Sequence, residues 1–185
     1  MTFQSRIKTW LGAPAAAGAA AEADFEALYR TELPRIYNFF RFRVGDGPLA
    51  EDLTSATFEK AWRHRQRYQR DLSAFSTWLF TIARRVAVDH YRSRRPDVSL
   101  EDRAALAPAG GALPSPEAWV ERQDEFDRLS ALLAGLSERD REVVSLRYGA
   151  GLTNRRIAEI SGLSESNVGV ILHRTLLKLR SAWED

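Results

Sequence analysis

The chain has 185 residues, enough for one medium domain or two small ones, and 44% of them are hydrophobic, so a buried core is expected. It contains no cysteine, which excludes disulfide bonds, thiolate zinc sites and cysteine nucleophiles. The net charge is only +2, but residues 60–95 hold 10 basic and 2 acidic side chains, whereas residues 96–125 hold 2 basic and 7 acidic ones. So positive a block indicates a polyanionic partner.

The first segment, residues 1–23, is expected to be an N-terminal extension. Its two basic residues, Arg6 and Lys8, precede a small-residue run, as in a secretory signal. However, alanine is too weakly apolar for the core of such a signal, and no apolar stretch reaches the ~18 residues that would cross a membrane. We therefore expect a cytoplasmic protein. Its three histidines are far apart in the sequence, so neither a metal site nor another cofactor is expected.

Residues 24–95 are predicted to form a first helical domain. Apolar residues recur there at spacings of three and four, and strand patterns are almost absent, which predicts an all-α fold. "GDGP" at 45–48 predicts a turn, and "YQRDLSAFS" at 68–76 interrupts the periodicity. Helices are expected at about 49–65 and 77–94.

A linker and a second helical domain are predicted to follow. Residues 96–116 contain four prolines, two adjacent glycines and no periodicity, which is typical of a flexible linker. Residues 117–185 return to helical spacing, with breaks at "GLSERD", "YGAGLT" and "SGLS".

The segment "NRRIAEISGLSESNVGVILH" predicts a helix-turn-helix. A small residue, Ala158, would let two helices cross closely, and Gly162 would allow the positive φ of the turn. Thr153 and Ser164 are good N-caps for the two helices. An ordinary helical hairpin is the structural alternative.

The periodicity also separates the buried residues of this helix pair from those that face outward. The residues expected to be buried are Ile157, Leu163, Val168, Ile171, Leu172, Thr175, Leu176 and Leu179. The residues expected to face outward are Ser166, Asn167, Gly169, Val170, His173, Arg174 and Lys178. Asparagine and arginine can make bidentate contacts to base edges in the major groove, so this outward face suits duplex DNA.

The basic block interleaves arginines with aromatic residues. Arginine neutralises phosphates, and aromatic rings stack on unpaired bases, so the mixture favours single-stranded or opened nucleic acid. Trp62, Phe75 and Phe80 lie on apolar stripes and are expected in the core. Tyr68 and Trp78 flank the interruption, and either a core or a surface position is open for them.

Three motifs in this order resemble the sigma factors of bacterial RNA polymerase, of the short extracytoplasmic-function (ECF) type. The resemblance covers about 25–95 and 126–183. "AEDLTSATFEKAW" (50–62) is similar to the polymerase-binding helix of that family, "FSTWLFTIARRVAVDHYRSRR" (75–95) to its −10 promoter helix, and residues 136–180 to its −35-binding domain.

The resemblance implies the following site residues. Those facing the clamp helices of the largest subunit of core RNA polymerase would be Glu51, Asp52, Ser55, Phe58 and Glu59. Those along the opened −10 strand would be Tyr68, Arg70, Ser76, Trp78, Arg84, Arg85, Asp89, His90 and Arg92. Those at the duplex −35 element would be Arg155, Arg156, Ser166, Asn167, Val170, His173 and Arg174.

The resemblance also implies further partners and the course of the linker. The loop 68–75 would capture a flipped base, at a cost of a few kcal/mol that stacking offsets. The linker would run toward the polymerase active site. The polymerase flap and an anti-sigma factor are implied as further contacts, with no insertion into a membrane.

This chain departs from the family pattern at several positions. Gly169 and Ile171 replace basic residues common in the recognition helix, so phosphate contacts are expected to shift to Arg155 and Arg156. A single tryptophan, Trp78, stands where primary sigma factors carry two, which implies weaker intrinsic melting.

Two other classes of protein compete with this interpretation. A stand-alone helix-turn-helix regulator is the main alternative, but the alternating strands and helices of a receiver domain are not visible. An enzyme is not expected, because the sequence offers no metal-ligand set, nucleophile–base pair or phosphate-binding loop.

Overall fold

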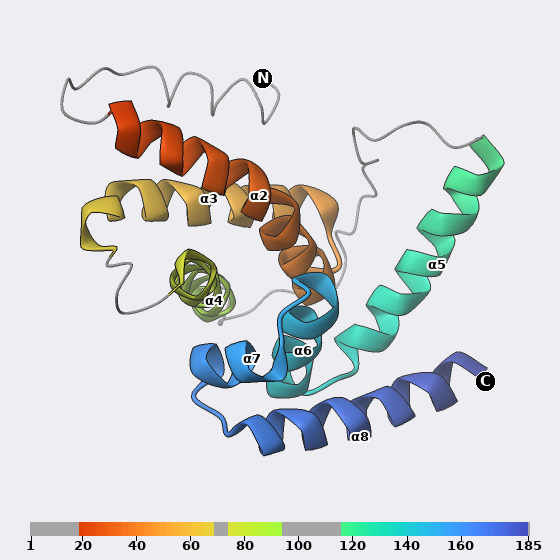
Figure 1. Ribbon diagram of the computed structural model, residues 1–185. Helices are drawn as coiled ribbons and strands as arrows, with labels where there is room; N and C mark the ends of the chain where they lie inside the picture. The colour runs from red at the N-terminus through yellow and green to blue at the C-terminus, as the bar shows by residue number, and fades with distance from the viewer. Residues whose placement is uncertain (1–18, 69–73, 94–115, 185) are drawn as a thin grey trace.

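The computed structural model describes residues 19–68, 74–93 and 116–184, and every regular element within them is a helix (Figure 1). The all-α prediction is therefore confirmed. The N-terminal half comprises α2 (Ala19–Val44), α3 (Gly47–Arg63), the 3₁₀ turn η1 (Arg65–Arg67) and α4 (Phe75–Ser93). The C-terminal half comprises α5 (Pro116–Ala134), α6 (Glu138–Val144), the π-helical segment η2 (Ser145–Gly149), α7 (Asn154–Ser161) and α8 (Glu165–Glu184).

Most of the predicted extension and linker, residues 1–18 and 94–115, lies outside the described residues. The described helices depart from the predicted bounds by a few residues. Helix α2 starts at Ala19, inside the segment expected to be an extension, and α8 continues to Glu184. None of the helices in the described ranges is long and apolar enough to cross a membrane.

The turn between α2 and α3 forms as its residue types dictate. Gly45 has a φ of 75°, which glycine adopts without steric cost. The Asp46 carboxylate accepts a hydrogen bond from the backbone N–H of Leu49 at 2.7 Å and so caps α3. Because Pro48 also fits the first turn of a helix, α3 begins at Gly47, two residues before the predicted start.

Large aromatic rings fill the core between α2, α3 and α4. Phe39, Phe40 and Phe80 are each 0% exposed, and the rings of Phe39 and Phe80 meet edge to face at 5.9 Å. Phe75 is also buried, while Trp62 is half-buried against the same core. The expectation that Phe75 and Phe80 belong to the core is thus confirmed.

The helix-turn-helix forms with the predicted caps. Thr153 Oγ1 accepts a hydrogen bond from the N–H of Arg156, and Ser164 Oγ accepts one from the N–H of Asn167 at 3.2 Å. Gly162 has a φ of 74°, as the turn requires.

The core beneath the helix-turn-helix follows the prediction at most positions, although Leu163 and Leu179 are only half-buried. Ile157 and Val168 are 0% exposed, and Leu172 and Thr175 are buried as well. Leu176, which was expected to be buried, is 42% exposed, because the second half of α8 extends past the small core formed by α6 and α7. The prediction for Leu176 was wrong.

The two halves pack directly against each other. In Figure 1, α6 lies against the C-terminal part of α2, and α7 lies beside α4. A Cβ atom on Gly149 would stand 2.7 Å from the carbonyl oxygen of Asn38 and 3.1 Å from the Cα of Phe39. Only a glycine allows the backbones of η2 and α2 to approach this closely, and a single apolar core runs through both halves.

Candidate nucleic-acid interface

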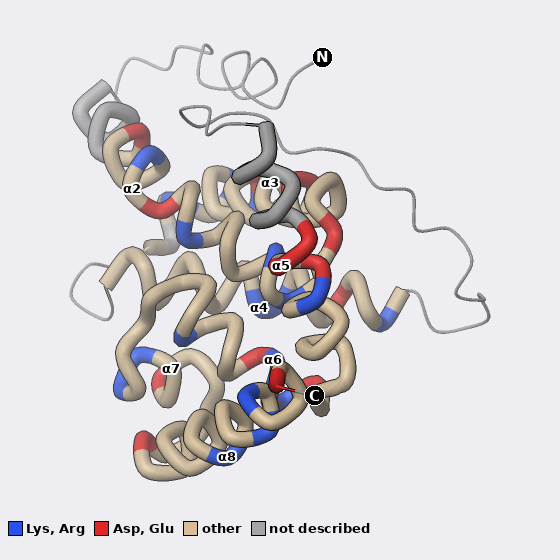
Figure 2. Tube along the Cα trace, turned by 90° about the vertical axis from the view of Figure 1, so that its right-hand side faces the viewer, with Lys and Arg blue, Asp and Glu red and all other residues tan. Residues whose placement is uncertain are grey.

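The basic side chains predicted for the −10 strand lie on α4. Arg85 and Arg92 are exposed, and Asp89 forms an ion pair with Lys60 of α3 at 3.2 Å. Figure 2 shows basic residues on α4 as well as on α7 and α8. Ser76 and His90 are half-buried on α4, and Arg70 lies outside the described residues. The described part of this surface is therefore an exposed basic helix face with one acidic residue.

An aromatic cluster stands at the start of that helix. The ring centroid of Phe75 lies 5.4 Å from that of Tyr68 and 5.6 Å from that of Trp78. Phe75 is buried, whereas Tyr68 and Trp78 are half-buried. The sequence left the position of these two rings open, and the structure places them at the boundary between the core and the surface.

Helix α8, the second helix of the helix-turn-helix, presents an outward face with few charges. Its exposed residues include Ser166, Asn167, Val170, His173 and Arg174. Val170 is 61% exposed, although an aliphatic side chain normally avoids water. An exposed amide next to an exposed methyl-bearing side chain matches the donor, acceptor and methyl pattern of the DNA major groove.

Two arginines at the edges of this face have internal partners. Arg174 donates hydrogen bonds to both carboxylate oxygens of Asp140 on α6, at 2.9 and 3.2 Å, and Asp140 is 7% exposed. Arg155, whose side chain is 81% exposed, is 3.6 Å from the carboxylate of Glu159. Since the Arg155 side chain is almost fully solvated, it can leave Glu159 for a phosphate at little cost.

The residues predicted to contact polymerase lie on α3, with one exception. Asp52 is exposed, while Glu51, Ser55 and Glu59 are half-buried. Phe58, in contrast, is 5% exposed and packs edge to face on Tyr29 at 4.6 Å.

The prediction that Phe58 faces a partner was therefore wrong. The ring instead supports α3 from within, because position 58 falls on the same buried stripe as Leu53 and Ala61. Its neighbour Tyr29 is enclosed by the same packing, and burial raises the pKa of Tyr29 to about 12.

The contacts between the halves use two side chains that were predicted to bind DNA. Arg84 on α4 forms an ion pair with Glu142 on α6, and the Glu142 side chain is only 11% exposed. Arg156 on α7 donates a hydrogen bond to Thr77 Oγ1 on α4 at 3.0 Å. Thus Arg84 and Arg156 each lie against the other half of the molecule.

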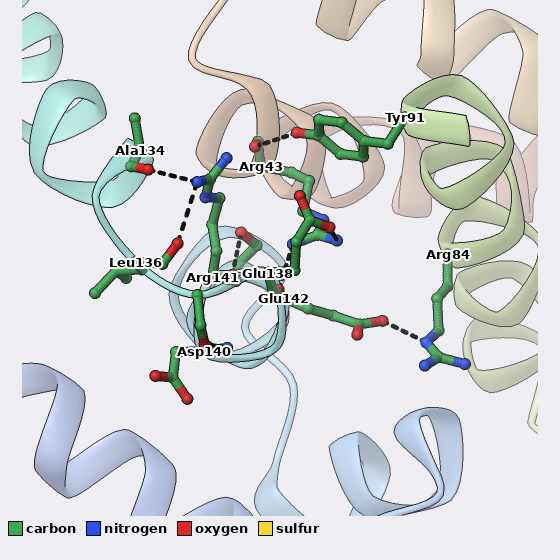
Figure 3. Close-up of polar contacts among 11 residues, drawn as sticks. Arg43, Arg84, Tyr91, Ala134, Leu136, Glu138, Asp140, Arg141 and Glu142 are labelled. Atoms are coloured by element: carbon green, nitrogen blue, oxygen red, sulfur yellow. Dashed lines mark hydrogen bonds and ion pairs between the residues drawn. The ribbon is translucent and has the colours of Figure 1, made fainter. Parts of the chain in front are cut away.

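A second group of contacts joins α2 to the C-terminal half (Figure 3). Arg43 is 3% exposed and donates to the backbone carbonyl of Glu138 at 2.6 Å and to its carboxylate at 3.0 Å. Within the N-terminal half, the hydroxyl of Tyr91 on α4 donates to the backbone carbonyl of Arg43 at 2.9 Å and so helps to hold Arg43 in place.

Arg35 makes the third polar link between the halves. Its Nε donates to the carbonyl of Ala150 at 2.9 Å, and its Nη1 donates to both carboxylate oxygens of Glu32. Burial raises the pKa of Glu32, and the nearby Arg35 charge opposes that rise. These links and the Gly149 contact are together called the docking interface.

Sequence reasoning did not find the docking interface. The acidic residues Glu138 and Glu142 and the hydroxyl of Thr77 carry no motif that distinguishes them from ordinary helix residues. The one usable signal was Gly149, a glycine next to a helix end with no turn that requires a positive φ. The described residues hold no cluster of three or more His, Asp or Glu side chains that could bind a metal ion.

Comparison with known proteins identifies both halves. Residues 28–96 match the family model for sigma-70 region 2, and residues 132–181 match the model for sigma-70 region 4. The chain is 32% identical to the ECF RNA polymerase sigma factor BldN of Streptomyces coelicolor, over 86% of this chain and 61% of BldN. It is also 32% identical to the RNA polymerase sigma factor CarQ of Myxococcus xanthus, over 86% of this chain and 89% of CarQ.

Among solved structures, the sigma factor RpoE of Bartonella quintana, in complex with the anti-sigma factor NepR, has a similar fold. The TM-score is 0.68 at 23% identity, over 87% of this chain and 97% of RpoE. At this level of identity the likeness establishes a shared fold.

Proposed function

The chain belongs to the extracytoplasmic-function group of the sigma-70 family of RNA polymerase sigma factors. We propose that it binds promoters at two separate elements. As an alternative sigma factor it directs RNA polymerase to promoters, and it is not an enzyme. Residues 24–95 would bind core polymerase and the −10 element, and residues 117–185 would bind the −35 element. The pairing of a weakly charged recognition helix with a basic, aromatic-flanked helix in one chain carries this proposal.

The −35 element would be bound as duplex by α8 and the start of α7. Asn167 would make a bidentate contact to a base, and Val170 would contact a thymine methyl group. Arg155 would neutralise a phosphate. The exposure of these three side chains supports the assignment, since none is needed for the core of the C-terminal half.

The −10 element would be bound as a single strand along α4. Tyr68 and Trp78 would stack on unpaired bases, and Arg85 and Arg92 would neutralise the backbone. The half-burial of the two rings supports this role. Each ring is held in place by packing on Phe75, and each still keeps a solvent-accessible part.

Core polymerase would bind the exposed side of α3, where Glu51, Asp52, Ser55 and Glu59 lie. Phe58 is left out of this surface because it is buried. The polymerase flap would contact the C-terminal half. An anti-sigma factor would be a further partner, as NepR is for the RpoE structure with the same fold.

Co-elution with purified core polymerase, followed by transcription from candidate promoters, tests the proposal. We expect a stable complex and promoter-specific transcripts. Asp52→Ala should weaken the complex, whereas Asp124→Ala, which removes an exposed carboxylate from α5, should not. Absence of co-elution together with tight binding to duplex DNA alone would favour a stand-alone helix-turn-helix regulator.

A further inference from the structure

We propose that Arg65 and Trp62, together called the stacked pair, form an additional binding site for one unpaired nucleotide, with the Arg65 guanidinium group stacked against its base. This inference rests on the proposed function, because it takes the opened DNA strand as the ligand. It deepens that function by adding a site beside Tyr68. Neither Arg65 nor Trp62 was among the residues that the family resemblance assigned to the −10 strand.

The first support is the geometry of the stacked pair. The Arg65 Cζ atom lies 4.0 Å from the centroid of the Trp62 ring, so the guanidinium group covers a face of the indole. Arg65 Nη1 also donates a hydrogen bond to the backbone carbonyl of Trp62 at 2.9 Å. These two contacts fix the orientation of a planar cation before any ligand binds. Planar guanidinium groups of this kind are surfaces on which unpaired bases stack.

Trp62 is in turn anchored by buried aromatic rings. Its ring meets that of Phe25 edge to face, with the centroids 5.0 Å apart, and Phe25 meets Phe75 in the same way at 5.9 Å. Phe25 and Phe75 are each 7% exposed, whereas Trp62 is half-buried. The stacked pair is therefore attached to the same buried ring, Phe75, that supports Tyr68 and Trp78.

The second support is the position of Arg65 relative to Tyr68. The N–H of Tyr68 donates to the carbonyl of Arg65 at 3.2 Å, which closes the 3₁₀ turn η1 after the end of α3 (Figure 1). In such a turn, side chains three residues apart lie on the same side, and they are separated by ~6 Å along the turn. A strand with one base stacked on Tyr68 therefore has a neighbouring base within reach of Arg65.

The third support is the charge around the stacked pair. Residues 60–67 contain four Lys or Arg residues, one histidine and no acidic residue. Arg63 forms an ion pair with Glu59, but within the described part of the chain Arg65 forms no ion pair with a carboxylate. The positive charge of Arg65 is thus not compensated there, which favours a polyanionic ligand such as DNA.

The chemistry of the site also defines what it can distinguish. Every base has a π face, so stacking on a guanidinium group accepts all four bases. The site should therefore lengthen the contact with the opened strand and raise its affinity, while sequence preference arises elsewhere.

A purely structural role for Arg65 would be to stabilise the end of α3. Its hydrogen bond to the Trp62 carbonyl and its positive charge both suit a helix C-terminus. Lysine can supply a donor and a positive charge at this position, but it has no planar guanidinium group. Arg65→Lys therefore separates the two roles: a structural role predicts parental DNA binding, and a stacking role predicts weaker binding.

Fluorescence anisotropy of the full chain with an end-labelled, mixed-sequence single strand of about 12 nucleotides is the first measurement. Arg65→Lys should bind about tenfold more weakly at every salt concentration. The slope of log affinity against log salt should not change, because the number of charges is kept.

Arg63→Lys is the matched control for this measurement. It is the same substitution two residues earlier, on a side chain that is 63% exposed and is paired with Glu59. It should bind the strand as the parent does, and circular dichroism and denaturant midpoints check that both variants keep the parental fold. Equal affinities for Arg65→Lys and Arg63→Lys would overturn the proposal.

An abasic scan locates the nucleotide. Core polymerase with the parent or a variant is bound to a premelted promoter template, and each nucleotide of the opened non-template strand is replaced in turn by an abasic site. At the position that stacks on Arg65, the abasic site should weaken binding about tenfold with the parent and by less than about twofold with Arg65→Lys. The adjacent position should show the same coupling to Tyr68→Ala. A scan in which no position is coupled to Arg65→Lys would overturn the proposal.

Failure of this inference is distinguishable from failure of the proposed function. Coupling of abasic sites to Tyr68→Ala or Trp78→Ala, but not to Arg65→Lys, would mean that only the additional site is wrong. A parent protein that does not co-elute with core polymerase would overturn the proposed function, and this inference with it.

Discussion

The ring of Trp78 lies 5.3 Å from the ring of Tyr68, at an interplanar angle of 37°, with Phe75 beneath both. The two outer rings are half-buried and come from opposite sides of the break between η1 and α4. A loop that begins at Tyr68 and returns at Phe75 is therefore closed by an aromatic contact. The same contact holds the two half-buried rings in a fixed relation to each other.

Trp78→Ala should slow promoter opening and leave core binding unchanged. Loss of one stacked base costs ~1–3 kcal/mol, so we expect opening to slow by on the order of tenfold. The measurement is the rate of open-complex formation on linear duplex and on premelted templates. Tyr148→Ala, which removes a 47% exposed ring from η2, is the control. Equal rates for Trp78→Ala and the parent on duplex templates would contradict the assignment.

Asn167→Ala should weaken promoters selectively, according to their −35 sequence. A lost bidentate contact is worth ~1–3 kcal/mol at the matched base and little elsewhere. Transcription from a template library with a randomised −35 element measures this preference. Arg155→Ala is the contrast, because Arg155 is proposed to contact a phosphate. Its loss should reduce transcription from all templates about equally and should lower the salt dependence of promoter binding. A uniform loss with Asn167→Ala would rule out base contact.

Asp140 and Arg174 should be energetically coupled. Arg174 donates two hydrogen bonds to a carboxylate that is 7% exposed, and hydrogen bonds to charged groups contribute about 1.5–3 kcal/mol. A double-mutant cycle of Asp140→Asn and Arg174→Ala, followed by denaturant unfolding, should give a coupling free energy of about 0.5–3 kcal/mol. Additive effects of the two substitutions would mean that the pair does not stabilise the fold.

The protein should lose stability between pH 10 and pH 12. Burial raises the pKa of Tyr29 from 10.0 to about 12, so the folded state holds the phenol proton more tightly than the unfolded chain does. This stabilisation is complete below pH 10 and is lost as the pH rises toward 12.

Tyr29→Phe tests the alkaline loss, because it keeps the ring on Phe58 and removes the titrating group. Denaturant midpoints measured from pH 8 to about pH 12 should fall less steeply for Tyr29→Phe than for the parent. The remaining fall includes Tyr37, whose pKa is also raised by burial. Identical pH profiles for Tyr29→Phe and the parent would show that Tyr29 does not contribute to the alkaline loss of stability.

Gly162→Ala should destabilise the helix-turn-helix by about 1–2 kcal/mol. Gly162 has a φ of 74°, and in this left-handed region the Cβ atom of an L-residue comes too close to the neighbouring carbonyl oxygen. Gly162→Asn should cost less, since asparagine tolerates this conformation. Unfolding by guanidinium chloride measures both. A ranking in which asparagine is the worse substitution would contradict the explanation.

Local chemistry made much of the C-terminal half predictable. The caps Thr153 and Ser164 and the turn at Gly162 each depend only on residues within four positions, so a single sequence contains the whole signal. The outward position of Asn167 followed from helical periodicity alone. These features needed no information about distant parts of the chain.

The errors at Phe58 and Leu176 arose from different sources, the family resemblance for Phe58 and helical periodicity for Leu176. Neither source says what covers a side chain in the folded protein. Phe58 is covered by Tyr29 of α2, and Leu176 lies beyond the end of the small core. The docking interface was missed for the same reason, since the pairing of Thr77 with Arg156 joins residues 79 positions apart.

Helix α2 serves both halves of the molecule at once. One side of it packs Phe39 on Phe80 of α4, while its backbone at Asn38 touches Gly149 of η2. A protein cut between residues 95 and 116 would yield an N-terminal fragment with an uncovered strip along α2, and a C-terminal fragment with uncovered apolar groups on η2. We therefore expect each fragment, produced alone, to be less soluble than the full chain, and the amide hydrogens of α2 to exchange faster in the N-terminal fragment.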